Sequence, residues 1–160
     1  MTEDGAFRGK SLRLRKPYLW TLYIVSIGVW LSGAIWLVLH YFFRVKGQFG
    51  FKTNPGEIWF LTTHGGFAFA SVFVFGLLWS SHVLAGWNMR WRRRSGGWLA
   101  GTTIFLTLTG YALYYIGSKD ILEWTAIAHW AVGLAAFALF LMHWLSKSRP
   151  HVPDRGVPGI

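Results

Sequence analysis

The pattern of apolar positions divides the chain into four long hydrophobic segments with short polar segments between them. A transmembrane helix needs about 20 predominantly apolar residues. The four segments have about this length or more, and they cover residues 17–43, 59–87, 98–116 and 121–146. Short connections favour helices that run up and down in turn. The pattern therefore predicts an all-α membrane protein, a four-transmembrane-helix up-down bundle.

The polar segments have turn and tail character. Residues 1–16 are basic and predict an N-terminal tail, and residues 147–160 contain three prolines without an apolar period, which predicts a flexible C-terminal tail. Residues 44–58 contain glycine, asparagine and proline, which are typical of a loop. We therefore expect one membrane domain, residues 17–146, between two tails.

Composition supports a membrane location and narrows the chemistry. Hydrophobic residues make up 53% of the chain and charged residues only 14%, whereas about a quarter of the residues in a soluble domain are charged. The chain has no cysteine. This excludes disulfides, thiolate-bound iron–sulfur clusters and covalent haem attachment. Histidine is then the obvious residue for binding a metal or a haem.

The positive charges predict the orientation of the chain. The formal net charge is +10, but the basic residues flank the apolar segments, so lipid and topology account for them rather than nucleic acid. Twelve lysines and arginines lie in the two tails and in the connection between the second and third segments, against four on the other side. The positive-inside rule then places both termini of this multi-pass membrane protein in the cytoplasm.

Two of the hydrophobic segments carry a histidine near each end. His64 and His82 are 18 residues apart, which is about five helical turns and ~27 Å of rise, so both rings leave the same helix face. His129 and His143 are 14 residues apart, about four turns and ~21 Å. Since a bilayer's hydrocarbon core is about 30 Å thick, each segment has a histidine at two membrane depths.

An up-down bundle makes the second and fourth segments parallel, so that His64 faces His129 and His82 faces His143. A bis-histidine haem iron needs one neutral imidazole on each side. We therefore predict two haem b groups between the second and fourth helices, with these four histidines as iron ligands. Small residues near the histidines leave room for a flat macrocycle, namely Gly66, Gly86 and Gly133. Arg90 is a candidate partner for the haem propionates.

His40, at the far end of the first segment, has several interpretations. It can replace His64 as a ligand, bind a third metal, or contact a propionate or quinone. The simpler interpretation, which we favour, is an interfacial histidine at a helix end. The first segment also contains small residues that let a neighbouring helix or a flat cofactor approach, namely Ser26, Gly28, Ser32 and Gly33.

The third segment is short and rich in threonine. It opens with Gly97-x-x-x-Gly101, a motif for close helix packing. Its threonine hydroxyls can bond back to their own helix. Polar residues near its far end and at the ends of neighbouring segments are candidates for a quinol site, namely Tyr111, Tyr114, Tyr115, Glu57, Lys119 and Glu123.

Several short runs of the sequence resemble those of the small prokaryotic four-helix cytochromes b. They are His64-Gly65-Gly66, His82-V-L-A-Gly86-Trp87, RRRSGG, LTGYALYY and HWAVG. That group includes cytochrome b561-like proteins and the cytochrome b subunits of formate dehydrogenases and nickel–iron hydrogenases. The resemblance implies haems held by transmembrane histidines, with His129 and His143 as a matching ligand pair. It also implies a location in the bacterial inner membrane and electron flow between a periplasmic redox protein or catalytic subunit and the quinone pool. In the formate dehydrogenase type the first helix supplies a ligand near its cytoplasmic start, where this chain has no histidine.

The leading hypothesis is a diheme transmembrane electron carrier, an electron-transfer subunit of a respiratory oxidoreductase complex rather than an enzyme alone. No catalytic residue is assigned, because the chain has no nucleotide motif and no catalytic carboxylate pair. The alternative is a haem-free membrane anchor or assembly subunit whose histidines only pack. A transporter with a histidine ladder is a third hypothesis. The lack of Asp and Glu in the membrane interior argues against it, since Glu57 and Glu123 lie at segment ends.

Overall fold

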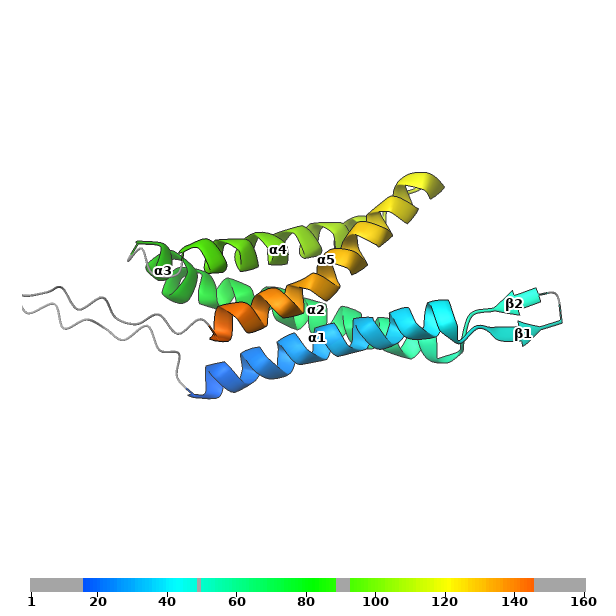
Figure 1. Ribbon diagram of the computed structural model, residues 1–160, viewed down its shortest axis with the longest axis horizontal. Coiled ribbons are helices and arrows are strands. Elements are labelled where there is room, and N and C mark those ends of the chain that lie inside the picture. Colours follow the sequence, from blue (N-terminus) through cyan, green and yellow to red (C-terminus); the bar gives the residue numbers. More distant parts are fainter. Residues whose placement is uncertain (1–15, 49, 89–92, 146–160) are drawn as a thin grey trace, which may run out of the picture.

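The structure is a computed structural model that describes residues 16–48, 50–88 and 93–145, most of which are helical. The helices are α1 (Lys16–Phe42), α2 (Gly56–Leu78), α3 (Ala85–Asn88), α4 (Arg93–Ala112) and α5 (Lys119–Leu145) (Figure 1). A π-helical segment, η1 (Trp79–Leu84), joins α2 to α3 without a break. Apart from Lys16, which begins α1, the two predicted tails lie outside the described residues. Residue 146 and Arg90 also lie outside them.

Three helical runs are long and apolar enough to cross a membrane. They are Lys16–Phe42, Gly56–Asn88 and Lys119–Leu145, and their bounds differ by only a few residues from the first, second and fourth predicted segments. Each has at least 27 residues, which exceeds the length that a bilayer requires. The chain therefore has the character of a multi-pass membrane protein.

The third predicted segment differs from the prediction. The helix there, α4, begins at Arg93 and ends at Ala112 instead of spanning residues 98–116, and the chain turns at residues 113–115. It is not among the helices that are apolar enough to cross a membrane. Two arginines and four threonines lower its hydropathy. Three of these threonine hydroxyls donate to carbonyls one turn earlier in α4, those of Thr103, Thr107 and Thr109.

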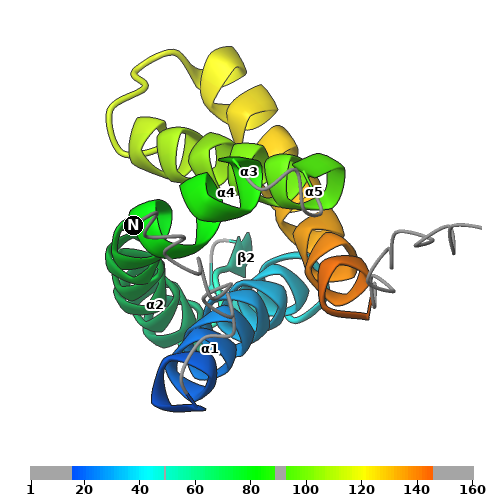
Figure 2. The ribbon, with the colours of Figure 1, turned by 90° about the vertical axis from the view of Figure 1, so that its left-hand side faces the viewer.

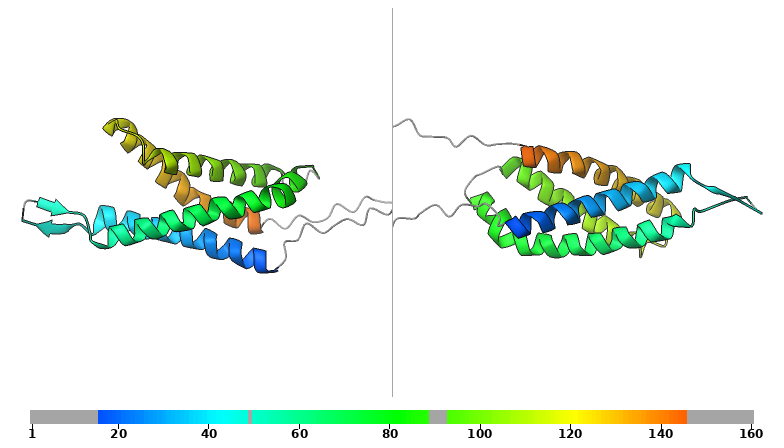
Figure 3. Two further views of the ribbon diagram at one scale, coloured as in Figure 1. Left: turned by 180° about the vertical axis from the view of Figure 1, so that it is seen from behind. Right: turned by 90° about the horizontal axis from the view of Figure 1, so that it is seen from below.

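The connection between α1 and α2 was predicted as a loop, but it contains a small antiparallel hairpin, so the all-α prediction is wrong here. Strand β1 (Val45–Gly47) pairs with β2 (Gly50–Lys52), with Val45 opposite Lys52. Gly50 has φ of 116°, a conformation that glycine adopts at no steric cost. The hairpin projects beyond the ends of the helices (Figure 3).

The long helices form two antiparallel pairs. Helix α1 packs along α2, and α4 packs along α5. A view along the bundle shows α2 and α5 on opposite sides of it (Figure 2). The two pairs meet where α1 approaches α5, through the stacked rings of Trp30 and Phe137, whose centroids are 4.5 Å apart. The helices that carry the predicted ligands are thus separated across the bundle.

The molecule is apolar outside and hollow inside. Large hydrophobic side chains are strongly exposed on every long helix, for example Trp20, Phe69, Leu108 and Met142. Among the described residues, Val25 is the only hydrophobic side chain classed as buried, at 8% exposure. A soluble protein would bury such side chains in a core. Here they suit contact with lipid, and a cavity takes the place of the core.

Candidate functional site

The candidate site is a cavity of about 2180 Å³ between the two helix pairs. All four long helices line it, and the lining includes the histidines His40, His64, His82, His129 and His143. Typical small-molecule sites have about 300–1,000 Å³. The cavity therefore has room for more than one large ligand, and most of its lining is apolar.

His64 of α2 and His129 of α5 lie together across this cavity. Their ring centroids are 6.3 Å apart and their ring planes are nearly perpendicular, at 87°. Two imidazoles that bind one metal ion from opposite sides, each at about 2 Å, have centroids about 6 Å apart. The spacing of these rings fits one shared metal ion.

The imidazole of His64 is held by α1. Its Nδ1 lies 2.8 Å from the Val29 carbonyl oxygen, and a carbonyl can only accept a hydrogen bond, so Nδ1 carries the hydrogen. The Ser32 hydroxyl lies further away, at 3.5 Å from Nδ1, and donates its own hydrogen to the Gly28 carbonyl at 2.7 Å. In a neutral ring the lone pair is then on Nε2, which is the state that a metal ligand needs.

The imidazole of His129 is held by α4 in a similar way. Its Nδ1 lies 2.8 Å from the Thr109 hydroxyl. That hydroxyl donates its single hydrogen to the Phe105 carbonyl, at 2.8 Å, so it accepts the hydrogen of His129 Nδ1. This bond again leaves the lone pair on Nε2. Both facing histidines thus have the tautomer that suits a metal ligand.

The second predicted pair lines the opposite end of the cavity. His143 of α5 lies next to α4, with its Nδ1 3.1 Å from the Ser95 hydroxyl. His82 lies within η1. The prediction that His64 and His82 share a helix face requires a regular α-helix between them. The π-helical segment has more residues per turn, so it changes the direction of the side chains within it. Both histidines nevertheless face the cavity.

The glycines have a partly unexpected distribution. Gly86 and Gly133 line the cavity, whereas Gly65 lines it in place of Gly66. The tightest contacts with histidines come from the neighbouring helices. A Cβ atom on Gly33 would lie 2.9 Å from the His64 ring, and one on Gly110 would lie 3.2 Å from the His129 ring. The sequence pattern indicated Gly33 only as a small residue, and it gave no signal for Gly110.

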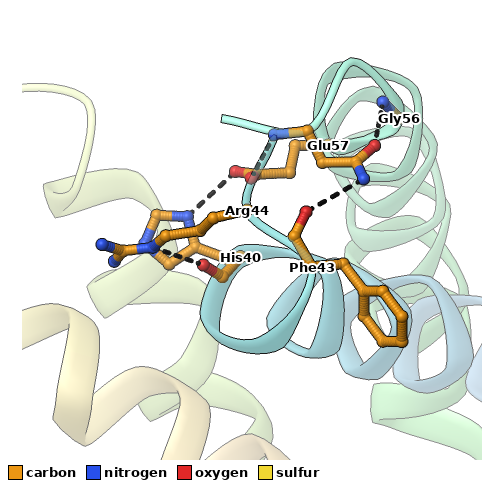
Figure 4. Close-up of polar contacts among 6 residues, drawn as sticks. His40, Phe43, Arg44, Gly56 and Glu57 are labelled. Atoms are coloured by element: carbon orange, nitrogen blue, oxygen red, sulfur yellow. Dashed lines mark hydrogen bonds and ion pairs between the residues drawn. The ribbon is translucent and has the colours of Figure 1, made fainter. Parts of the chain in front are cut away.

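His40 belongs to a polar cluster at the β-hairpin end of the bundle (Figure 4). Its Nδ1 lies 2.9 Å from Glu57 Oε2, and its ring stacks on Trp36. Glu57 is only 7% exposed, and its other oxygen accepts a hydrogen bond from the Asn54 backbone N–H at 3.0 Å. The Asn54 side chain also donates to the Phe43 carbonyl. The cluster ties the end of α1 to the start of α2, which matches the structural interpretation of His40.

Of the six candidate residues for a quinol site, four line the cavity and two do not. Tyr111, Tyr114, Lys119 and Glu123 line the cavity near the β-hairpin end. Glu57 is engaged with His40 instead, and Tyr115 lies against Tyr111 with ring centroids 4.7 Å apart. The structure therefore brings together four of the six residues.

The motif Gly97-x-x-x-Gly101 does not bring two backbones together. Both glycines line the cavity. A Cβ atom on Gly97 would lie 3.3 Å from the Trp87 ring, whereas one on Gly101 would meet nothing within 4 Å. The motif contributes space rather than helix packing.

His64 and His129 form a facing pair rather than part of a chelating cluster. Within residues 16–48, 50–88 and 93–145, no group of three or more His, Cys, Asp or Glu side chains is suited to hold a metal ion. Two facing imidazoles fit a metal whose other ligands come from a macrocycle. Comparisons of the chain with protein-family models, curated proteins and solved structures found no match.

Proposed function

We propose that the protein is a diheme b-type transmembrane electron carrier, a membrane subunit that passes electrons between a periplasmic redox partner and the quinone pool. The observation that carries this proposal is the facing pair His64 and His129. Their rings are 6.3 Å apart across an apolar cavity, and both Nδ1 atoms are engaged in hydrogen bonds.

His64 and His129 would hold one haem b, and His82 and His143 the other. A haem iron with two imidazole ligands takes up and releases one electron at a time. The chain's own residues orient the imidazoles and exclude water with apolar side chains. At the β-hairpin end, Arg44 and Lys119 line the cavity, and their positive charges suit the propionates of a haem.

Two histidine pairs at two depths suit transfer of electrons across a membrane. In this proposal α4 is the fourth membrane helix despite its polarity, because the hydroxyls of Thr103, Thr107 and Thr109 are satisfied by α4 carbonyls, and that of Thr109 by His129 as well. The distribution of basic residues supports cytoplasmic termini, with the β-hairpin on the periplasmic side. A catalytic partner would provide the substrate specificity.

The test is a set of histidine variants examined by reduced-minus-oxidised spectroscopy. We expect His129→Leu to lose one haem, His143→Leu to lose the other, and the double variant to lose both. His151→Leu, in the C-terminal segment, is the matched control and should keep both haems. A double variant that retains the haem content of the wild type, with its helical circular dichroism unchanged, would overturn the assignment.

A further inference from the structure

Three of the four histidines lie against the same dipeptide on a neighbouring helix, a hydroxyl residue followed by glycine. We call these dipeptides the hydroxyl–glycine pairs. They are Ser32–Gly33 beside His64, Ser95–Gly96 beside His143, and Thr109–Gly110 beside His129. In each case the neighbouring helix is the antiparallel partner within the same helix pair.

The two pairs on α4 repeat with the spacing of the histidines on α5. Ser95 and Thr109 are 14 residues apart, as are His129 and His143. Antiparallel packing places Ser95–Gly96 against His143 and Thr109–Gly110 against His129. Because both helices have the same rise per residue, equal spacings keep both contacts in register.

The two members of each pair have different physical roles. The glycine lets the imidazole lie close to the backbone. A Cβ atom would come within 2.9 Å of the His64 ring at Gly33 and 3.2 Å of the His129 ring at Gly110, whereas at Gly96 it would lie in ordinary contact with the His143 ring, at 3.6 Å. The hydroxyl oxygen lies 2.8 Å from Nδ1 of His129 and 3.1 Å from Nδ1 of His143. At His64 it lies 3.5 Å from Nδ1, whose hydrogen goes to the Val29 carbonyl of α1 at 2.8 Å.

We infer that the hydroxyl–glycine pairs are positioning elements, which fix the orientation of three histidine rings and direct Nε2 toward a metal. The inference rests on the proposed function and deepens it. Thr109 shows this role most clearly. Its hydroxyl hydrogen is donated to the Phe105 carbonyl, so its hydroxyl oxygen accepts the hydrogen of His129 Nδ1. Partners that hold the second nitrogen of a ligand histidine raise the basicity of the ligand.

The inference also explains the composition of α4. A helix that only filled the bundle would be as apolar as α1 or α5. Instead α4 carries serine, threonine and glycine at the positions that face the two ligand histidines of α5. Two of the polar residues of α4, Ser95 and Thr109, thus follow from the task of orienting these histidines.

The experiment compares Thr109→Val, Thr109→Ser and Thr125→Val in the full chain. Valine has nearly the shape of threonine but cannot accept a hydrogen bond, whereas serine keeps the hydroxyl. Thr125, on α5, donates to the Ile121 carbonyl of its own helix at 2.7 Å and is the matched control. The readouts are the ¹⁵N NMR shifts of the His129 ring, the midpoint potential of each haem, and haem retention during competition with apomyoglobin.

We expect Thr109→Val to lose the Nδ1–H form of His129 as the single tautomer and to shift one midpoint potential upward, because a less basic imidazole stabilises oxidised iron less. Haem affinity at that site should fall by about 10–100-fold. Thr109→Ser should restore all three readouts, and Thr125→Val should leave them unchanged.

The two proposals fail differently. A wild-type protein without haem would overturn the proposed function, while the NMR measurement would still test whether Thr109 fixes the His129 tautomer. Conversely, two haems in the wild type with an unchanged tautomer and unchanged potentials in a folded Thr109→Val protein would overturn the positioning role and leave the proposed function intact.

Discussion

At the scale of residues, the histidines could be predicted and their immediate partners could not. Their spacings place them on common helix faces, which is a local property of the sequence. The hydrogen-bond partners lie on other helices, so they depend on which helices pack together and in which register. The 14-residue spacing of Ser95 and Thr109 was a signal that equals the spacing of His129 and His143. Its meaning is evident only once α4 is known to pack against α5.

Gly33 gives a sharp test at this scale. A Cβ atom there would lie 2.9 Å from two atoms of the His64 ring, so Gly33→Ala should displace the imidazole. We expect the affinity for one haem to fall by about 10–100-fold, measured by transfer of haem to apomyoglobin.

Gly66→Ala is the matched control, because a Cβ atom at Gly66 would meet nothing within 4 Å. It introduces the same methyl group on the helix that carries His64. Equal loss of haem in the two variants would show that the close approach of Gly33 to His64 is unimportant.

At the scale of elements, the apolar pattern predicted three long helices well and the irregular segments poorly. The π-helical segment Trp79–Leu84 contains neither proline nor glycine, so nothing in its composition distinguishes it from the α-helix around it. The start of α2 did carry a signal. Asn54 and Glu57 have the spacing of a capping box, and the Glu57 carboxylate does accept from the Asn54 backbone N–H.

The polar cluster around Glu57 predicts a loss of stability on substitution. Glu57→Ala removes the partner of both the His40 ring and the Asn54 backbone N–H. Because Glu57 is largely buried, we expect the free energy of unfolding in detergent to fall by about 1–3 kcal/mol. Chemical unfolding followed by circular dichroism measures this change.

Glu123→Ala is the control for this prediction, since Glu123 is an exposed carboxylate near the start of α5. It should change the free energy of unfolding by no more than about 0.5 kcal/mol. Equal effects of the two substitutions would contradict the stabilising role of the cluster.

At the scale of the whole molecule, the bundle has an apolar exterior and a cavity where a soluble protein has its core. Hydrophobic content alone predicted the membrane class. It did not predict that the two helix pairs would surround a cavity of about 2180 Å³, because that depends on the angles at which the pairs meet. The distribution of basic residues predicts the orientation of the bundle in the membrane.

The absence of native cysteine makes the orientation measurable. We expect a single cysteine at Lys46→Cys, in the β-hairpin, to react with a membrane-impermeant maleimide in spheroplasts. Ser148→Cys, near the C-terminus, should react only after the membrane is permeabilised, because twelve basic residues favour the cytoplasm for the tails. The reverse labelling pattern would invert the predicted topology.

The most direct test of the central claim is the haem content of the purified wild-type protein, measured as the pyridine haemochrome per mole of chain. The histidine pairs predict two b-type haems per chain, produced in cells with an adequate haem supply. A stoichiometry of zero under these conditions, in a protein with intact helical circular dichroism, would contradict the account and leave a haem-free membrane anchor as the better explanation.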